Sequence, residues 1–403
     1  MKYKALSTLA AAGIVLAGTP AFAQTLNWDL VNEYDPNSIH AQVSDKFIEE
    51  LKADSNGEIN VTAHHGASLG YKSVDQFDAV GDGAVQVATS YIGAWAGIDP
   101  VFLLPSLPFL APTTKDTWAL YQAAKPYYAK VLEENNQVLL FANPWPPSGI
   151  WAKKPVDSME ALKGLKIRTY DSNGTVTMRA ADASPIQLSW ADVVPQLATN
   201  GIDAVLTSAD GGAAAHLWEH LPVFTEVNYA MPLQIMHMNK DTYDSLSDAQ
   251  KEAVLKAAEA AEAYGWDLLA ERVKNNYKTM RDNGMTVVED ASPEYIAALT
   301  KAGEESMKDW KAKKRAATTT HTHKRTDTRA RTHTHTLTHA RARAHTHTHT
   351  HTLTQTHTHE HTHTHAHTHT HTHTRTHAHT HAPTHTHTHT HTHTHTHTHT
   401  HTH

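Results

Sequence analysis

Arg168 has the sequence context that best fits the binding of an anion. It lies near the end of a short predicted strand, residues 166–169, and the next turn, residues 171–173, opens a helix. A guanidinium beside the main-chain amides of a helix start can hold a carboxylate through two parallel hydrogen bonds. An ordinary arginine on the surface of a strand has the same local sequence. From the residues alone, both interpretations stay open.

A second candidate is the segment His-Leu-Trp-Glu-His at residues 216–220, which has the H-x-x-E-H spacing of one class of zinc peptidase. Two imidazoles four residues apart share a helix face and can hold zinc, with the glutamate as general base. However, Pro222 ends the helix directly afterwards, and no third ligand is evident. A secreted zinc peptidase is therefore an alternative function, and an ordinary helix end is the other interpretation.

The composition argues against several classes of function. The chain has 403 residues, no cysteine, 34 Lys and Arg, 41 Asp and Glu, and 37 His. Without cysteine there is no disulfide framework and no cysteine-based metal site or nucleophile. The first 313 residues have a net charge of −14, which disfavours a nucleic-acid partner because affinity there comes from neutralising phosphates. Apart from the zinc alternative and metal binding by the histidine-rich tail, we expect no enzyme activity, no metal and no cofactor.

The first 23 residues have the pattern of a secretory signal peptide. Lys2 and Lys4 precede an apolar run, residues 5–18, and Ala21 and Ala23 are the small residues of a cleavage site. The run is shorter than the roughly 20 residues that span a bilayer. We therefore expect cleavage after Ala23, export to the periplasm and no insertion into the membrane.

The last part of the chain, residues 314–403, has a different amino-acid composition from the rest. It has a net charge of +7 and holds 31 of the 37 histidines, mostly alternating with threonine. This segment has too few apolar residues to bury the surface that would offset the entropy of ordering, which predicts disorder. Because histidine-rich tracts bind zinc, copper or nickel, a metal-binding protein that acts through this tail is another alternative. A CA dinucleotide repeat in the DNA also reads as alternating His and Thr, which explains the tract without any function.

Between these ends, strand and helix patterns alternate, which predicts an α/β fold with parallel sheets. The predicted strands are residues 26–31, 59–61, 85–88, 166–169, 186–188, 202–206 and 286–288, and the predicted helices are residues 37–52, 73–80, 113–134, 175–183, 192–199, 247–281 and 293–310, with a proline-rich loop at 100–112. A second α/β unit begins near Ile150. Two such lobes leave a cleft between them, where small ligands usually bind.

Several segments together resemble the solute-binding proteins of tripartite ATP-independent periplasmic (TRAP) transporters, the DctP family. Residues 162–168, Leu-Lys-Gly-Leu-Lys-Ile-Arg, and then 183–185, Ala-Ser-Pro, resemble its G-x-K-x-R stretch and small-residue-Pro turn. Residues 196–204 resemble its L-Q-x-G-x-x-D-G stretch, and residues 66–70 its G-x-L-G turn. The resemblance extends from about Leu26 to Lys313.

The resemblance implies a two-lobed periplasmic binding protein fold with an interdomain cleft and a long helix that crosses both lobes. We expect lobe 1 to comprise about 24–149 plus part of 231–285, and lobe 2 about 150–230 plus the C-terminal remainder up to 313. The family binds a small solute, closes around it and delivers it to a membrane permease. The expected partners are therefore a small organic carboxylate and the subunits of a TRAP permease.

The resemblance also suggests roles for single residues. By motif position, Arg168 pairs with the carboxylate, Trp190 is an aromatic pocket residue, and Glu33 matches an acidic residue that some members use for zwitterions. Thr207 stands where the family has a pocket asparagine, and Ser148 where sialic-acid binders have a second arginine, so a sugar acid of that type is disfavoured. An aromatic, hydroxy or keto acid, or a C4-dicarboxylic acid, is expected instead. The candidate ligand-binding residues are Arg168, Trp190, Glu33, Tyr91, Trp145, Thr207, Ser208 and Asp210.

Overall fold

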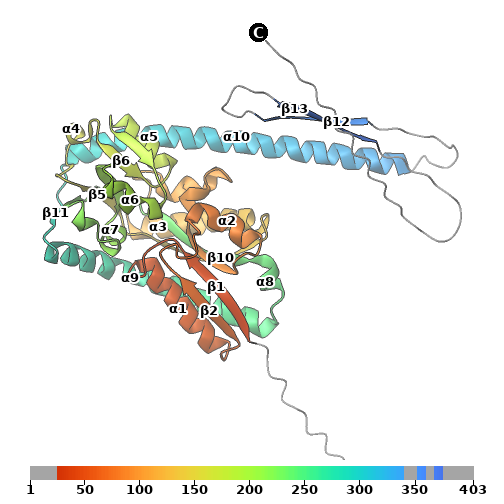
Figure 1. The fold of residues 1–403 in the computed structure, drawn as a ribbon, viewed down its shortest axis with the longest axis horizontal. Helices are drawn as coiled ribbons and strands as arrows, with labels where there is room; N and C mark the ends of the chain where they lie inside the picture. The colour runs from red at the N-terminus through yellow and green to blue at the C-terminus, as the bar shows by residue number, and fades with distance from the viewer. Residues whose placement is uncertain (1–24, 340–351, 360–366, 375–403) are drawn as a thin grey trace, which may run out of the picture. The chain divides into compact units, whose positions relative to one another are not determined.

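The computed structural model describes residues 25–339, 352–359 and 367–374, with side chains up to residue 317. The predicted signal peptide lies outside the described residues. The chain divides into two compact units, Met1–His323 and Lys324–His403. The first unit contains both large sheets (Figure 1).

The sheet of lobe 1 has the strand order β2-β1-β3-β10-β4. Its strands are β1 (Leu26–Asn32), β2 (Ile59–His64), β3 (Val87–Tyr91), β4 (Gln137–Pro144) and β10 (Leu233–Asn239). The first three pair in parallel, and β10 is antiparallel to both β3 and β4. The helices of this lobe are α1 (Ile39–Asp54), α2 (Ser73–Gly81), α3 (Thr114–Glu133) and α8 (Lys240–Asp244). We call these elements lobe 1 from here on.

The sheet of lobe 2 has the order β11-β9-β5-β8-β6-β7. Its strands are β5 (Ser148–Ala152), β6 (Lys166–Thr169), β7 (Ser184–Gln187), β8 (Ala204–Ser208), β9 (Val223–Thr225) and β11 (Thr286–Val288). The helices α4 (Met159–Leu162), α5 (Ser172–Ala180), α6 (Val193–Ala198) and α7 (Ala209–Ala214) belong to the same lobe. Strand β6 pairs in parallel with β7 and β8, whereas β5 is antiparallel to β8 and β9.

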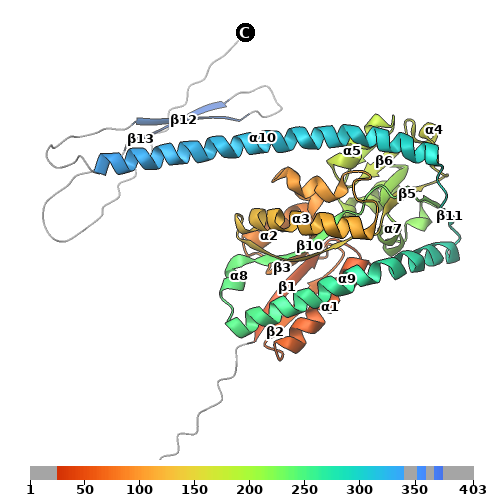
Figure 2. The same ribbon diagram turned by 180° about the vertical axis from the view of Figure 1, so that it is seen from behind.

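One long helix, α9 (Asp248–Asp282), contacts both lobes. It begins in a capping box of Ser247 and Gln250 and packs against α1 and β4 of lobe 1 and then against α7 and β11 of lobe 2 (Figures 1 and 2). Its buried residues are small where α1 and β4 come close. A Cβ at Gly265 would lie only 2.5 Å from the side-chain nitrogen of Asn143, so this glycine permits the close approach.

The architecture confirms the two-lobed α/β fold, but the sheets are mixed and not purely parallel. Strands β4, β5, β9 and β10 have no counterpart among the predicted strands. The residues of β5, β9 and β10 are buried along their whole length, so none of these strands has the solvent-exposed polar face that marks a half-buried strand. The proline-rich segment also holds a short 3-10 helix, Pro100–Ser106.

The C-terminal region was expected to be disordered beyond residue 313. The structure continues helix α10 from Pro293 to His339 and pairs β12 (Thr352–His359) with β13 (His367–Thr374) in antiparallel fashion. The other tail residues lie outside the described part, and their disorder stays a prediction. Within the described residues, no helix combines the length and the apolar character that crossing a bilayer needs.

Candidate ligand-binding site

A partly open pocket with about 310 Å³ of empty space lies between the two lobes, and we call it the inner cavity. It is lined by Tyr34, Tyr91, Trp145, Ser148, Arg168, Tyr170, Trp190, Thr207, Ser208 and Pro232. A second space of about 590 Å³, the outer cavity, shares Arg168, three tyrosines and Trp190 with the first and extends to Glu33 and Ser73. Both lobes therefore contribute to the walls of both cavities.

Arg168 is placed by the pairing of β6 with its two neighbours in the sheet. It lies opposite Ile186 of β7 and Val205 of β8. Its Nε donates to the carbonyl oxygen of Leu188 at 3.0 Å, and its Nη1 donates to that of Leu206 at 3.4 Å. These two bonds do not use Nη2. The main chain therefore fixes one edge of the guanidinium and orients the group in the wall of the cavity.

The guanidinium of Arg168 is buried, with 2% of the residue exposed. Among the ion pairs of the described residues, none includes Arg168; the rings of Trp190 and Tyr170 lie 5.4 and 6.0 Å from its guanidinium carbon. Burial lowers the pKa of Arg168, because removal from water disfavours the charged form. A buried cation without a carboxylate partner is costly, and an anionic ligand would offset that cost.

Aromatic side chains from both lobes make up half of the residues that line the inner cavity. The ring of Tyr34 lies 4.6 Å from that of Trp145 and stacks on Trp190 at 5.8 Å, while Tyr91 meets Tyr170 edge-on at 5.6 Å. Burial raises the pKa of the hydroxyls of Tyr34, Tyr91 and Tyr170. These hydroxyls therefore stay neutral at ordinary pH and can act as hydrogen-bond donors or acceptors.

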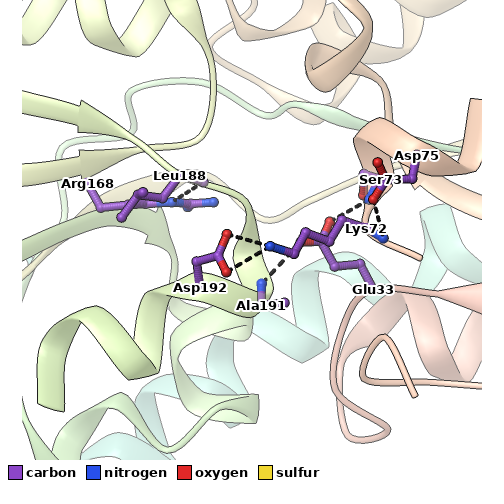
Figure 3. Close-up of polar contacts among 8 residues, drawn as sticks. All are labelled: Glu33, Lys72, Ser73, Asp75, Arg168, Leu188, Ala191 and Asp192. Atoms are coloured by element: carbon purple, nitrogen blue, oxygen red, sulfur yellow. Dashed lines mark hydrogen bonds and ion pairs between the residues drawn. The ribbon is translucent and has the colours of Figure 1, made fainter. Parts of the chain in front are cut away.

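Glu33 lies in the wall of the outer cavity, between the two lobes (Figure 3). Its Oε2 accepts a hydrogen bond from the main-chain nitrogen of Ser73 at 2.8 Å, and its Oε1 accepts one from that of Ala191 at 3.1 Å. Ser73 belongs to lobe 1 and Ala191 to lobe 2. Both oxygens of this carboxylate thus already bind protein amides.

Thr207 and Ser208 end strand β8 and line the inner cavity. Ser208 also caps α7, since its Oγ accepts a hydrogen bond from the main-chain nitrogen of Gly211 at 3.1 Å. Its side chain is therefore partly committed to the local fold.

Asp210 is a candidate that the structure places elsewhere, outside the lining of both cavities. Its Oδ2 accepts from the main-chain nitrogen of Ile39 at 2.9 Å, and its Oδ1 accepts from Asn276 at 3.0 Å and pairs with Arg272. These contacts join α7 to α1 and α9. The fold thus uses the Asp210 carboxylate to join helices.

The H-x-x-E-H segment does not form the helix that a zinc site needs. His216 has a left-handed backbone with φ 52°, and Leu217–Glu219 is a short 3-10 helix. The two imidazoles therefore do not share a face of one α-helix, and the ring of His216 stacks on Trp218 at 4.8 Å. The part of the chain that the structure describes holds no group of three or more His, Cys, Asp or Glu arranged for a metal.

Some lining residues were missing from the sequence-based candidates. Tyr170 lies two residues after the candidate Arg168, so its sequence position was a usable signal. Pro232 belongs to the segment just before β10 and lines the inner cavity. Nothing near Pro232 in the sequence connects it with Arg168.

Comparison with known proteins gives a consistent result. The family model of bacterial extracellular solute-binding protein, family 7 (DctP), matches residues 31–314. The ectoine-binding periplasmic protein TeaA of Halomonas elongata is 25% identical over 320 residues, which is 78% of this chain and 89% of TeaA.

Solved structures of related receptors are also similar. The Bordetella pertussis extracytoplasmic solute receptor DctP6, which binds pyroglutamic acid, is 30% identical with a TM-score of 0.69, over 72% of this chain and 96% of that one. A TRAP solute-binding protein from an unidentified microbe of a marine metagenome, specific for pyroglutamate, is 30% identical with a TM-score of 0.68, over 72% of this chain and 94% of that one.

Proposed function

Because this chain belongs to family 7 of the bacterial extracellular solute-binding proteins, the DctP family of TRAP transporters, we propose that it binds a small organic monocarboxylate between its lobes in the periplasm. The bound acid is then delivered to a TRAP permease in the membrane. The mechanism is binding without chemical change. Residues 1–23 serve as the export signal and are removed after Ala23.

The observation that carries the proposal is the buried Arg168, which has main-chain carbonyls on one edge and aromatic rings around it. A carboxylate on its Nη atoms would complete a charge-assisted pair inside a low-dielectric cavity, where such a pair is strong if its geometry is good. Arg168 is also the one residue with a full charge among those lining the inner cavity. This charge balance favours one carboxylate over two, and so a C4-dicarboxylate is the less favoured ligand.

The rest of the inner cavity favours a neutral, partly apolar body. Tyrosine, serine and threonine hydroxyls offer hydrogen bonds, and the tryptophan and tyrosine rings offer flat apolar surfaces. Pyroglutamate has this chemistry, with one carboxylate on a small ring that carries a neutral amide. Two similar receptors bind it, and we choose it as the first ligand to test, followed by small aromatic, hydroxy and keto acids.

Closure follows from the way both lobes contribute to the cavity. A ligand that touches Arg168 and Trp190 of lobe 2 and Tyr34 and Tyr91 of lobe 1 makes its full set of contacts only when the lobes are together. Its higher affinity for the closed state shifts the population toward that state.

The test is a binding screen with the full exported chain, in buffer with EDTA so that metal binding by the histidine tract does not contribute. Pyroglutamate, ectoine, succinate, a hydroxy acid and an aromatic acid are compared by thermal shift and calorimetry. A ligand at a hundred times its Kd should add about 2.7 kcal/mol to the free energy of unfolding.

Arg168→Gln provides the matching loss of function. We expect it to weaken the binding of pyroglutamate by about a hundredfold or more, because a desolvated carboxylate would lose its charged partner. Arg179→Gln, on the exposed side of α5, is the control and should leave Kd unchanged. An Arg168→Gln protein that folds normally and binds within twofold of the unsubstituted chain would contradict the proposal.

A further inference from the structure

Three consecutive residues of lobe 2 each contact a different residue of lobe 1. Trp190 donates its Nε1–H to Oδ2 of Asp35 at 3.0 Å, and Ala191 donates its main-chain N–H to Oε1 of Glu33 at 3.1 Å. Asp192 accepts from the ammonium group of Lys72 at 2.8 and 2.7 Å (Figure 3). We call residues 190–192 the latch segment.

Glu33 is the central contact of the latch segment. It comes directly after β1, and its second oxygen accepts the main-chain N–H of Ser73, the first residue of α2. Lys72, the residue before Ser73, forms the ion pair with Asp192. The main-chain N–H of Lys72 donates to Oδ2 of Asp75 at 3.2 Å. The same turn of lobe 1 thus orients both Glu33 and Lys72 toward lobe 2.

The latch segment also belongs to the ligand site, because it begins with Trp190. The Trp190 ring lies over the guanidinium of Arg168 at 5.4 Å and stacks on Tyr34. Contacts that fix residues 190–192 against lobe 1 therefore fix the ring that covers Arg168. A ring held in this way would delay the escape of a ligand from the inner cavity.

We propose that the latch segment holds the lobes closed and that Glu33 is a positioning residue for this closure, with no direct bond to the ligand. This inference rests on the proposed function, since closure is closure around a bound acid. It also has a consequence for selectivity. Each oxygen of Glu33 already accepts one protein N–H, which makes this carboxylate a weaker partner for a cationic group, so the site should favour anions with neutral bodies over zwitterions.

Two measurements test the latch in the full chain. Because the chain has no cysteine, nitroxide labels on Asp78→Cys in α2 and Ala198→Cys in α6 report the distance between the lobes. The distance distribution is recorded without ligand and with pyroglutamate. Stopped-flow tryptophan fluorescence measures the rate at which pyroglutamate dissociates, koff.

Glu33→Gln should lengthen the distance between the labels both with and without pyroglutamate, and should raise koff about tenfold, because an amide side chain cannot accept both N–H groups. Lys72→Gln should raise koff about two- to fivefold, since the ion pair is half-exposed. At higher salt concentration, the difference in koff between Lys72→Gln and the unsubstituted chain should become smaller. The double variant Lys72→Glu with Asp192→Lys exchanges the two charges, and it should bring koff most of the way back to the value of the unsubstituted chain. Glu160→Gln and Lys115→Gln are the exposed controls.

Distances that stay the same in Glu33→Gln without pyroglutamate, together with slower binding or weaker affinity, would mean that Glu33 is a ligand contact, and would overturn the proposal. An unchanged koff in both Glu33→Gln and Lys72→Gln would also overturn it. If the unsubstituted chain fails to bind pyroglutamate, the proposed ligand is wrong, and the label distances still decide the latch.

Discussion

Among the polar contacts between the two lobes, two have opposite character. The first, which we call the anchor, joins Asp210 of α7 to Arg272 and Asn276 of α9 and to the amide of Ile39 in α1; the Asp210 side chain is 0% exposed and that of Arg272 17%. The second is the latch segment, whose ion pair of Lys72 and Asp192 is 34% and 43% exposed.

This difference in burial separates a permanent joint from a reversible one. Opening the anchor would leave a carboxylate without partners in a buried site, which costs several kcal/mol. Opening the latch segment lets water solvate Lys72 and Asp192, so little free energy is lost. Separation of the lobes at the outer cavity also breaks the buried hydrogen bond from the hydroxyl of Tyr91 to Asp171, while the lobes stay joined through α7, α1 and α9.

The largest expected effect comes from a change to the anchor. Asp210→Asn removes the charge that faces Arg272 and should lower the free energy of unfolding by about 3–5 kcal/mol, because breaking a buried pair leaves one charge uncompensated. Urea denaturation followed by circular dichroism measures it. A loss below 1 kcal/mol would show that the anchor is no stronger than an exposed ion pair.

A second expected effect is acid sensitivity close to the anchor. Burial, and to a smaller extent the charge of Arg272, lowers the pKa of His40 from 6.5 to about 3. The unfolded chain therefore binds a proton in this range and the folded chain does not. Stability from His40 is complete above pH 6.5 and is lost as the pH falls from 6.5 toward 3, by about 1.4 kcal/mol for each pH unit.

His237 has the same lowered pKa of about 3, caused by its burial, and adds to this slope. Denaturation at several pH values between 4 and 7 gives the dependence, and His40→Gln should make it shallower. His220→Gln, at the half-buried end of the H-x-x-E-H segment, is the control variant for His40→Gln in these measurements. Equal slopes for His40→Gln and the unsubstituted chain would exclude a neutral, buried His40.

The smallest expected effect on stability comes from the latch segment. Asp192→Asn should change the free energy of unfolding by less than about 1 kcal/mol, because an exposed ion pair contributes little. The same urea experiment measures it beside Asp210→Asn. A loss as large as that of Asp210→Asn would remove the distinction between anchor and latch.

Several features of this protein follow from residues close together in the chain. The alternation in β1, the helical spacing in α1 and the serine cap of α9 each involve neighbours a few positions apart, and the predicted elements agree with the structure there. Arg168 was also identified in this way, because a strand end followed by a helix start is a local pattern. The resemblance to the DctP family rests on the same kind of short, contiguous motifs.

The partners of the polar side chains were decided by the tertiary structure alone. Asp210 was a candidate ligand-binding residue, yet its carboxylate accepts from Ile39, 171 positions away. Glu33 matched a ligand-contacting position, yet one of its oxygens accepts from Ala191, 158 positions away. A carboxylate binds whichever donors the fold brings to it, and local sequence carries no record of donors more than a hundred residues distant. Arg168 could therefore be recognised as a candidate from the local sequence. The hydrogen-bond partners of Glu33 and Asp210 were decided only by the packing of the two lobes and the long helix.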